Sequence, residues 1–429
     1  GGQRAAGGGE GGREVEGWRG GGGGERGGGS RGGGGREGGG GGGPGRGGLG
    51  GGGEGVEGRK GGEGGDRRGG GGPGVVLGDL HAAVEAEGLF YAPDPNSLGY
   101  CSIGGNLACN AGGPRAFRYG TTRNWTLGLQ MVTADGTLHQ VGKPTAKGVT
   151  GYDLAGLLVG SEGTLGVITE ATLRLVPKPQ AVATLLVFLR SRDDLGTVIT
   201  DTLKRGWLPR CLEFVDDIAL ELMRPRAGIA VPDGAHAMLL VEVDGDADRI
   251  EVLRDRTGEA MLDSGAIDVL VAHSSEEREK LWAARREMSR VLRESAAHKL
   301  SEDIVVPRSR IGALLDRCRA LSEQHNIVMP TYGHAGDGNL HVNFLWNHDD
   351  DKPRVHAAIR GLFEATIELG GTLSGEHGIG ILKAPYLPLE QSPALIALQE
   401  RIKDVFDPRG ILNPGKIFPA GAKRFHGAC

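Results

Sequence analysis

The glycine-rich segment at residues 1–74 is the feature that most limits what this chain can fold into. Glycine occupies 44 of these 74 positions, and 11 basic and 9 acidic residues make up most of the remainder. Its apolar content is little more than Val15, Trp18, Leu49 and Val56. Such a segment buries too little apolar surface to offset its chain entropy. We expect residues 1–74 to be disordered, either as genuine low-complexity sequence or as a misread segment of a GC-rich gene.

The charge of the chain argues against a nucleic-acid partner. Stretches such as RGGGSRGGGGREGGG resemble the Arg-Gly segments that bind RNA, but acidic residues offset most of the basic ones. The net charge of −5 gives no electrostatic case for nucleic acid or for an anionic membrane. A non-catalytic binding protein with an RNA-binding tail remains an alternative, which an RNA gel shift that requires residues 1–74 would reveal.

The rest of the chain has an ordinary globular composition, and 429 residues are enough for two or three domains. It contains no apolar run of the roughly 18–20 residues that span a bilayer, and its start lacks a signal-peptide pattern. The five cysteines are scattered and form no CxxC motif. We expect a cytoplasmic protein with reduced thiols and no transmembrane segment, at most peripheral to the inner membrane.

The periodicity after residue 75 predicts an α+β protein. Residues 77–88 have helical spacing, residues 126–142 read as a hairpin turning at Asp135-Gly136, and residues 162–179 read as a second strand pair. Strands at 183–190 and 236–245 then alternate with helices at 193–206 and 247–262. We place the domain boundary within 178–181, which gives domains at 75–180 and 181–420 and a tail at 421–429.

Two histidines lie in a glycine-rich loop and the strand that follows it, PTYGHAGDGNLHVNFL, at residues 330–345. Gly333, Gly336 and Gly338 favour close backbone approach to something bound there. His334 and His341 are candidate metal ligands, because histidine is the commonest protein ligand of metals. The alternative is structural, with His334 capping a turn and His341 half-buried on a strand.

A second glycine-rich loop, GGTLSGEHGIGILK, supplies a carboxylate and a third histidine. Neighbouring residues on an extended segment point to opposite sides, so Glu376 and His377 can serve different partners. His334, His341 and Glu376 would make a three-ligand site for a divalent metal such as zinc or manganese, leaving His377 as a general base. The alternative for this loop is a structural ion pair or a capping glutamate.

A third group of glycines lies between residues 104 and 166, in CSIGGNLACNAGG and LLVGSEGTLGVIT. Neither segment is a G-x-G-x-x-G motif or a Walker loop, so the nicotinamide and P-loop patterns both fail. Such glycines can present backbone N–H groups to an anionic, planar ligand lying in a groove. Ordinary turn chemistry is the alternative.

Together these segments, with PDPNSLGYCSIGGNLACNAGG, RYGTTRNWTLGLQMV, GYDLAGLLVGSEGTLGVITEATLRLVPKP and IKDVFDPRGILNPGKIF, resemble the FAD-linked oxidases. That family includes the flavin subunit of glycolate oxidase, D-lactate dehydrogenase and D-2-hydroxyglutarate dehydrogenase. The resemblance runs from about residue 74 to residue 418. It implies a vanillyl-alcohol-oxidase (PCMH)-type FAD-binding domain followed by a ferredoxin-like substrate domain.

The resemblance also implies roles for individual residues. The metal ligands match His334, His341 and Glu376, the base matches His377, and the substrate carboxylate matches Arg285, with Ser289 and Asn343 as lesser contacts. The implied FAD contacts are Ser102, Gly104, Gly105, Asn110, Gly113, Tyr119, Gly120, Glu162, Gly166, Ile168 and Asn413.

The implied reaction is oxidation of a small D-2-hydroxy acid, of the lactate, glycolate or 2-hydroxyglutarate class, to the 2-oxo acid. Flavin takes the Cα hydride, and a metal assists removal of the hydroxyl proton. A quinone, a cytochrome, an electron-transfer flavoprotein or an iron–sulfur subunit could accept the electrons. A zinc-dependent hydrolase is the alternative activity, since it would also use two histidines, a glutamate and a base.

The chain departs from the family pattern at its front. Family members begin with another subdomain whose loop wraps the FAD pyrophosphate, and here the glycine-rich segment holds that place. The first subdomain is therefore expected to be missing, and FAD binding by the chain as it stands is expected to be weak. An inactive, truncated family member is the corresponding alternative.

Overall fold

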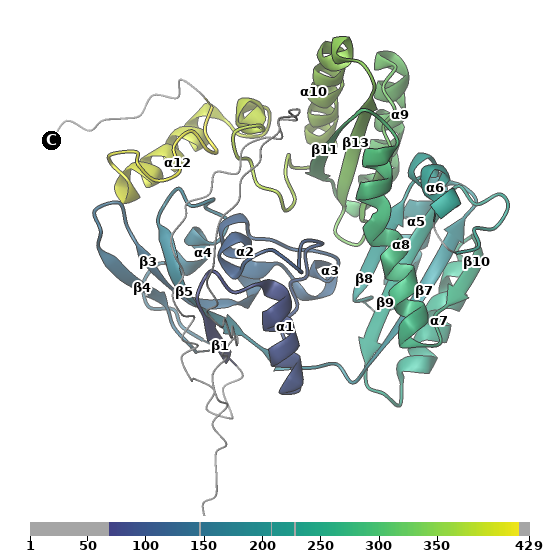
Figure 1. The fold of residues 1–429 in the computed structure, drawn as a ribbon, viewed down its shortest axis with the longest axis horizontal. Helices are drawn as coiled ribbons and strands as arrows, with labels where there is room; N and C mark the ends of the chain where they lie inside the picture. The colour runs from purple at the N-terminus through teal and green to yellow at the C-terminus, as the bar shows by residue number, and fades with distance from the viewer. Residues whose placement is uncertain (1–67, 146, 207, 227–228, 420–429) are drawn as a thin grey trace, which may run out of the picture.

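The computed structural model describes residues 68–145, 147–206, 208–226 and 229–419, which form two domains (Figure 1). The expectations for most of the glycine-rich segment and for the tail at 421–429 concern residues outside this part of the chain. The expectation of disorder is wrong for residues 68–74, because β1 (Arg68–Gly71) pairs with β5 (Val167–Arg174). A β-ladder is made by backbone groups, so glycines at a sheet edge can join it without side chains.

The first domain is built on a four-stranded antiparallel sheet in the order β1-β5-β3-β4. The predicted hairpin is confirmed as β3 (Thr126–Val132) and β4 (Leu138–Gly142). The predicted helix is confirmed as α1. The helices of this domain are α1 (Leu77–Ala86), α2 (Ile103–Cys109), α3 (Ala116–Tyr119) and α4 (Leu154–Leu158).

The prediction that residues 162–179 form two strands paired with each other is wrong. This stretch holds one long strand, β5, which pairs with β1 and β3, and a two-residue strand, β6 (Val176–Pro177), which pairs with β2 (Leu89–Phe90). Leu173 and Leu175 are buried in the domain core. Residues 162–179 therefore contribute to two different sheets. The local sequence pattern does not predict which distant strands they pair with.

The second domain is built on a seven-stranded antiparallel sheet in the order β10-β7-β9-β8-β12-β13-β11. The predicted strands at 183–190 and 236–245 are confirmed as β7 and β9, and β7 begins inside the predicted boundary. The strands are β7 (Ala181–Leu189), β8 (Cys211–Val215), β9 (Ala237–Gly245), β10 (Ala266–Val271), β11 (His298–Val305), β12 (Thr331–His334) and β13 (Asn339–Trp346).

Helices cover both faces of this sheet. One apolar core lies between the sheet and α5 (Leu195–Lys204), α7 (Ile250–Asp263), α9 (Ile311–His325) and α10 (Lys352–Glu368). A second core lies on the opposite face, under α6 (Asp217–Met223) and α8 (Ser275–Glu294). The predicted helices at 193–206 and 247–262 are thus confirmed as α5 and α7, and so is the α+β class.

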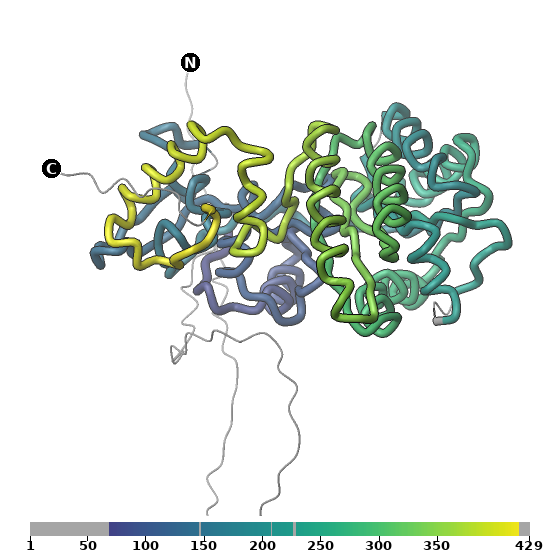
Figure 2. The backbone as a smooth tube through the Cα atoms, turned by 90° about the horizontal axis from the view of Figure 1, so that it is seen from above, coloured from purple at the N-terminus to yellow at the C-terminus, as the bar shows by residue number. Residues whose placement is uncertain are grey.

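The chain returns to the first domain at its C-terminal end. After α11 (Leu387–Glu390), α12 (Pro393–Phe406) packs Ile402 and Phe406 against the core of the first domain. Both views place α12, coloured yellow, on the side of the first domain (Figures 1 and 2). Within the described residues, no helix combines the length and the apolar character needed to cross a bilayer.

Candidate active site

The two candidate metal-ligating histidines lie on the hairpin of β12 and β13. Tyr332 pairs with His341 across the ladder, so His334, two residues along β12, faces the same side as His341. His334 and His341 are 3% and 5% exposed, and their rings are 5.3 Å apart. Gly333 allows the strands to meet here, because a Cβ at this position would lie 2.4 Å from the Asn339 carbonyl oxygen.

Glu376 brings a carboxylate to the two imidazoles from the loop after α10. Its Oε1 is 3.5 Å from Nε2 of His334 and 3.5 Å from Nε2 of His341. A tetrahedral zinc ion with ligand atoms at about 2.0–2.1 Å holds neighbouring ligand atoms roughly 3.4 Å apart. The two distances from Glu376 are close to that separation, and the ligand atoms of all three side chains lie within 4.8 Å of one another, so the group could hold a metal ion.

A residue of the first domain also hydrogen-bonds to the Glu376 carboxylate. The backbone N–H of Gly113 donates to Oε2 of Glu376 at 3.1 Å. Gly113 has φ +105°, and a Cβ there would lie 2.5 Å from the carbonyl group of Asp94, so only glycine allows this approach. The predicted flavin-contact residue Gly113 is thus in direct contact with a predicted metal ligand.

A buried carboxylate orients His334 from behind. Nδ1 of His334 donates to Oε1 of Glu213 at 2.5 Å, and Oε2 of Glu213 is 2.7 Å from Nη2 of Arg285. A hydrogen bond of this kind orients the ring with Nε2 toward Glu376, where a metal would bind in place of a proton. Burial opposes a charged imidazole, but Glu213 and Glu376 raise the pKa of His334 well above its usual value. Burial lowers the pKa of His341 to about 4, which keeps that ligand neutral.

His377 is placed differently from the other two histidines. Its side chain is 52% exposed, and its Nε2 is 4.0 Å from Oε1 of Glu376. Its ring stacks on that of His341, with centroids 5.4 Å apart and an interplanar angle of 19°. His377 therefore borders the three-ligand cluster while remaining accessible to a ligand and to solvent.

The three predicted substrate contacts lie on the α8 side of the sheet. Arg285, 2% exposed, is paired with Glu213 and lies over the Tyr332 ring, while its Nε makes no hydrogen bond. Asn343 is fully buried and its Oδ1 has no partner. Ser289 on α8 accepts a hydrogen bond from Lys299 of β11 at 2.9 Å.

Sequence reasoning missed Glu213 and Lys299. Glu213 is the one charged residue within the buried strand CLEFV. A single charge in an otherwise apolar strand could have marked it as a functional residue. Lys299 pairs with Leu345 in the register that sets Asp303 opposite His341, so it lies on the same face as that histidine. Burial, followed by the charge of Arg293, lowers the pKa of Lys299 to about 8. Lys299 is a further cation available to a carboxylate.

The predicted flavin contacts at the start of α2 are engaged within the first domain. Ser102 caps α2 by accepting from the N–H of Gly105 at 3.2 Å. The N–H of Gly104 donates to the Pro73 carbonyl at 2.8 Å. At the other end of α2, Asn110 has φ +54° and accepts from the N–H of Arg123 at 2.9 Å.

Glu162 and Asn413 meet beside the loop that carries Glu376. The Glu162 carboxylate accepts from the backbone N–H groups of Ile379 and Gly380 at 2.7 and 2.8 Å. Asn413 donates to the Glu162 carbonyl. Asn413 also lines a cavity of about 310 Å³ formed largely by the C-terminal segment. This part of the predicted flavin set therefore adjoins the predicted metal set.

The remaining predicted flavin contacts pack elsewhere. Tyr119 donates to Oδ2 of Asp244 in the second domain at 2.7 Å, and Ile168 packs against the core of the first domain. A Cβ at Gly120 would lie 2.4 Å from Oδ1 of Asn124, and one at Gly166 would lie 2.2 Å from Cε of Met131. Close packing within the first domain accounts for both glycines.

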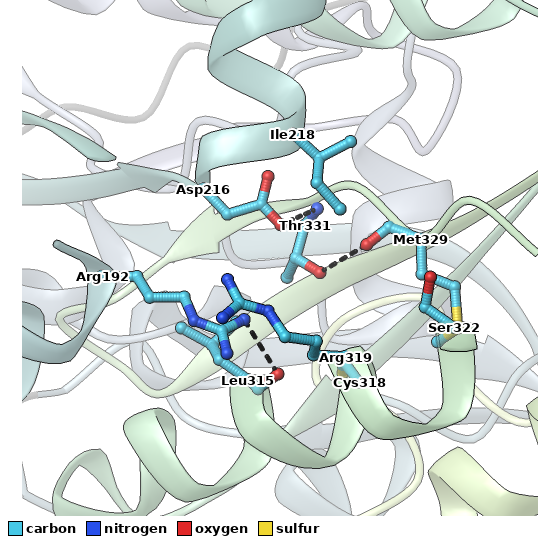
Figure 3. Close-up of a pocket in the computed structure, with 9 residues that line it drawn as sticks. All are labelled: Arg192, Asp216, Ile218, Leu315, Cys318, Arg319, Ser322, Met329 and Thr331. Carbon is cyan, nitrogen blue, oxygen red and sulfur yellow. Dashed lines mark hydrogen bonds between the residues drawn. The ribbon is translucent and has the colours of Figure 1, made fainter. Parts of the chain in front are cut away.

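A small cavity elsewhere does not compete with this site. It has a volume of about 30 Å³ and lies beneath α9, lined by residues that include Arg192, Asp216, Cys318 and Thr331 (Figure 3). Thr331 is at the opposite end of β12 from His334. This volume holds about one water molecule, which is too little for a substrate.

Two family matches cover most of the described chain. Residues 178–417 match the family described as FAD linked oxidases, C-terminal domain. Residues 71–142 match the family described as FAD binding domain.

Curated relatives match about four fifths of this chain. The chain is 40% identical over 353 residues to glycolate oxidase subunit GlcD of Bacillus subtilis (strain 168), covering 82% of this chain and 75% of the relative. It is 34% identical to D-lactate dehydrogenase of Anaerostipes hadrus, covering 80% and 74%. It is 35% identical to D-2-hydroxyglutarate dehydrogenase of Stutzerimonas stutzeri (strain A1501), covering 81% and 76%.

Solved structures confirm the expected fold. p-Cresol methylhydroxylase with substrate bound superposes with a TM-score of 0.64 at 13% identity, covering 82% of this chain and 76% of that one. Alkyldihydroxyacetonephosphate synthase superposes with a TM-score of 0.60 at 16% identity, covering 81% of this chain. The chain spans 64% of the length of that second structure.

Proposed function

The chain belongs to the FAD-linked oxidase family, and on that premise we propose that it oxidises a small D-2-hydroxy acid to the 2-oxo acid at the junction of its two domains. Relatives named for glycolate, D-lactate and D-2-hydroxyglutarate support this substrate class. The proposal includes a divalent metal held by His334, His341 and Glu376, and His377 as the base.

One observation carries the proposal. Predicted flavin-contact residues hydrogen-bond directly to the loop that bears the metal ligand and the base: Gly113 to Glu376 at 3.1 Å, and Glu162 to Ile379 and Gly380 at 2.7 and 2.8 Å. A redox cofactor on the first domain and a metal on the second could therefore act on one small molecule. Hydrolysis needs no redox cofactor, so a hydrolase would not require this contact between the flavin-type residues and the metal-binding loop.

The proposed position of FAD is on the side of the first domain. Glu162, Gly113 and Asn413 lie next to the 374–380 loop there, and a Cβ at Gly163, which has φ +69°, would lie 3.9 Å from Nδ2 of Asn413, an ordinary van der Waals distance. When bound there, flavin would supply the acceptor for the Cα hydride.

The cluster fits zinc or manganese through its donor set of two imidazoles and one carboxylate. When bound, the metal would supply Lewis acidity toward the substrate hydroxyl. Glu213 and Gly113 then hold two of the three ligands in place, through Nδ1 of His334 and Oε2 of Glu376. The chain itself thus fixes the orientation of the ligand atoms.

His377 takes the hydroxyl proton in this proposal, because it is the exposed histidine beside the cluster. Histidine is the side chain that most often transfers protons in general acid–base catalysis. Arg285, Ser289 and Asn343, with Lys299, supply the polar groups for the substrate carboxylate, which would orient Cα toward the flavin.

A substrate panel tests this function. The protein is supplied with excess FAD and Zn²⁺ or Mn²⁺, because FAD binding is expected to be weak, and is mixed without oxygen with D- and L-forms of lactate and 2-hydroxyglutarate and with glycolate. At least one D-2-hydroxy acid, or glycolate, should bleach flavin absorbance near about 450 nm and yield the 2-oxo acid. Flavin-loaded protein that none of them reduces would contradict the proposal.

A further inference from the structure

Asp303 makes an unusual set of contacts beside the proposed metal site. Its side chain is fully buried on β11, and its Oδ2 accepts from four donors of one short loop. These donors are Oγ of Ser374 at 2.9 Å and the backbone N–H groups of Gly375, Glu376 and His377 at 2.9, 3.0 and 3.0 Å. Three consecutive amides that converge on one oxygen form an anion nest, and this one is filled by a carboxylate of the same chain.

We propose that Asp303 is a positioning residue that fixes the backbone of Glu376 and His377 and so sets the metal ligand and the base in place. The inference rests on the proposed function, because it concerns the residues that the function assigns to metal and proton. Glu376 and His377 lie outside every helix and strand, so no regular backbone ladder holds them. Their backbone N–H groups are held instead by hydrogen bonds to the Asp303 carboxylate.

Asp303 is itself rigidly held. Its Oδ1 accepts from Nδ2 of Asn339 at 2.5 Å. The buried Lys383 donates to the carbonyls of Asp303 and Leu373 at 2.6 and 2.7 Å, which ties β11 to the start of the loop. The nest therefore meets a carboxylate that is held in place from both sides.

The hydrogen bonds of Asp303 also help to choose between two overlapping groups of candidate metal ligands. Asp303, His341 and His377 also lie close enough together to form a three-ligand group, which shares His341 with the group that includes Glu376. A carboxylate oxygen offers about two lone pairs, so the four donors around Oδ2 of Asp303 leave that oxygen none for a metal, and Oδ1 already accepts one hydrogen bond from Asn339. Asp303 thus acts through Glu376 and His377, and the metal belongs to the cluster with Glu376.

The substitution Asp303→Asn keeps the shape of the side chain but removes its charge. One of the two oxygens becomes an NH₂ group, which cannot accept, so either the loop amides or the amide of Asn339 then face a donor. Since loss of a group that orients a metal ligand costs about 10–100-fold in metal affinity, we expect a fall of that size. The carboxylate of Asp216, the N-cap of α6 directly after β8, is the matched control, because it is also buried and accepts from two backbone N–H groups, of Ala219 and Thr331.

The experiment titrates the full chain with Zn²⁺ against a chromophoric chelator, at a temperature where circular dichroism shows each variant folded. Wild type should bind about one equivalent, Asp303→Asn should bind about 10–100-fold more weakly, and Asp216→Asn should stay within about twofold of wild type. Equal affinity for Asp303→Asn and wild type, or an equal loss in Asp216→Asn, would overturn the positioning role alone. A wild-type chain that binds no metal would overturn the proposed metal site and this inference with it.

A second variant covers the case in which Asp303→Asn does not fold. Ser374→Ala removes one of the four donors from the loop and leaves Asp303 in place. It should weaken Zn²⁺ binding by a smaller factor, about three- to tenfold, since one of the loop's hydrogen bonds is lost. Unchanged affinity in Ser374→Ala would then overturn the positioning role.

Discussion

His377 is the most exposed of the three histidines at the junction, and the account assigns the proton to it for that reason. His377→Ala should lower kcat by about 10² to 10⁴, the usual contribution of a general base, while Zn²⁺ affinity changes little. Steady-state kinetics and a metal titration on the same preparation check both. His356→Ala, an exposed histidine on α10, is the control and should match wild type. If the activity of His377→Ala stays within about tenfold of wild type, His377 is not the general base.

Lys299 gives the site a pH dependence on its alkaline side. Burial lowers the pKa of Lys299 to about 8, so the folded protein loses this positive charge as the pH rises through that value. If Lys299 holds the substrate carboxylate, KM should rise above pH 8 in wild type while kcat changes less. In Lys299→Arg the charge persists, so the rise in KM should disappear. A KM that is flat from pH 7 to 9.5 in wild type would place Lys299 outside the substrate site.

At the scale of elements, the 374–380 loop is fixed from two sides, by Asp303 of its own domain and by Glu162 of the other. Glu162→Gln leaves one oxygen to accept from Ile379 and Gly380, so the loop should open more easily, by on the order of 1–3 kcal/mol. Hydrogen exchange at the amides of residues 379 and 380 should be faster in this variant. Glu170→Gln, an exposed glutamate on β5, is the control. Equal protection in wild type and Glu162→Gln would show that the first domain does not hold the loop.

The N-cap of α6 predicts how stability changes with pH. Burial raises the pKa of Asp216 to about 7, although the amides of Ala219 and Thr331 oppose this shift. Because the folded pKa exceeds the unfolded one, this carboxyl contributes stability fully below about pH 4, and the contribution is lost as pH rises through 7. Urea unfolding should therefore show a smaller loss of stability from pH 5 to 8 in Asp216→Asn than in wild type. Asp263→Asn, an exposed carboxylate on α7, should keep the wild-type slope.

Elements with a local signal could be predicted from the sequence. The Asp135-Gly136 turn marks the β3–β4 hairpin, and the apolar runs of β7 and β9 mark buried strands. The split of residues 162–179 between two sheets could not be predicted, because it depends on pairing with β2 and with the glycines of β1. In the site, His334, His341 and Glu376 come together as the sequence predicts. Asp303 and Glu213 were missed because their roles depend on partners more than 70 and 120 residues away.

At the scale of the whole molecule, contacts between the domains hold the two halves of the site together. Asp244 of β9 accepts from Arg118 at 2.6 Å and from Tyr119 at 2.7 Å, and Gly113 reaches Glu376 from the same segment of the first domain. On the other side, α12 returns to the first domain and brings Asn413 to Glu162 (Figure 1). This arrangement supports the proposal that a cofactor on one domain and a metal on the other act on the same substrate.

Flavin reduction before and after metal removal tests that claim most directly. Flavin-loaded protein is mixed without oxygen with its best 2-hydroxy acid in a stopped-flow instrument, first as loaded with Zn²⁺ or Mn²⁺, then after a chelator has stripped the metal, and finally after the metal is restored. Stripping the metal should slow flavin reduction by about 10² or more while flavin stays bound, and restoring the metal should return the rate. An unchanged reduction rate in protein shown to be free of metal would contradict the claim.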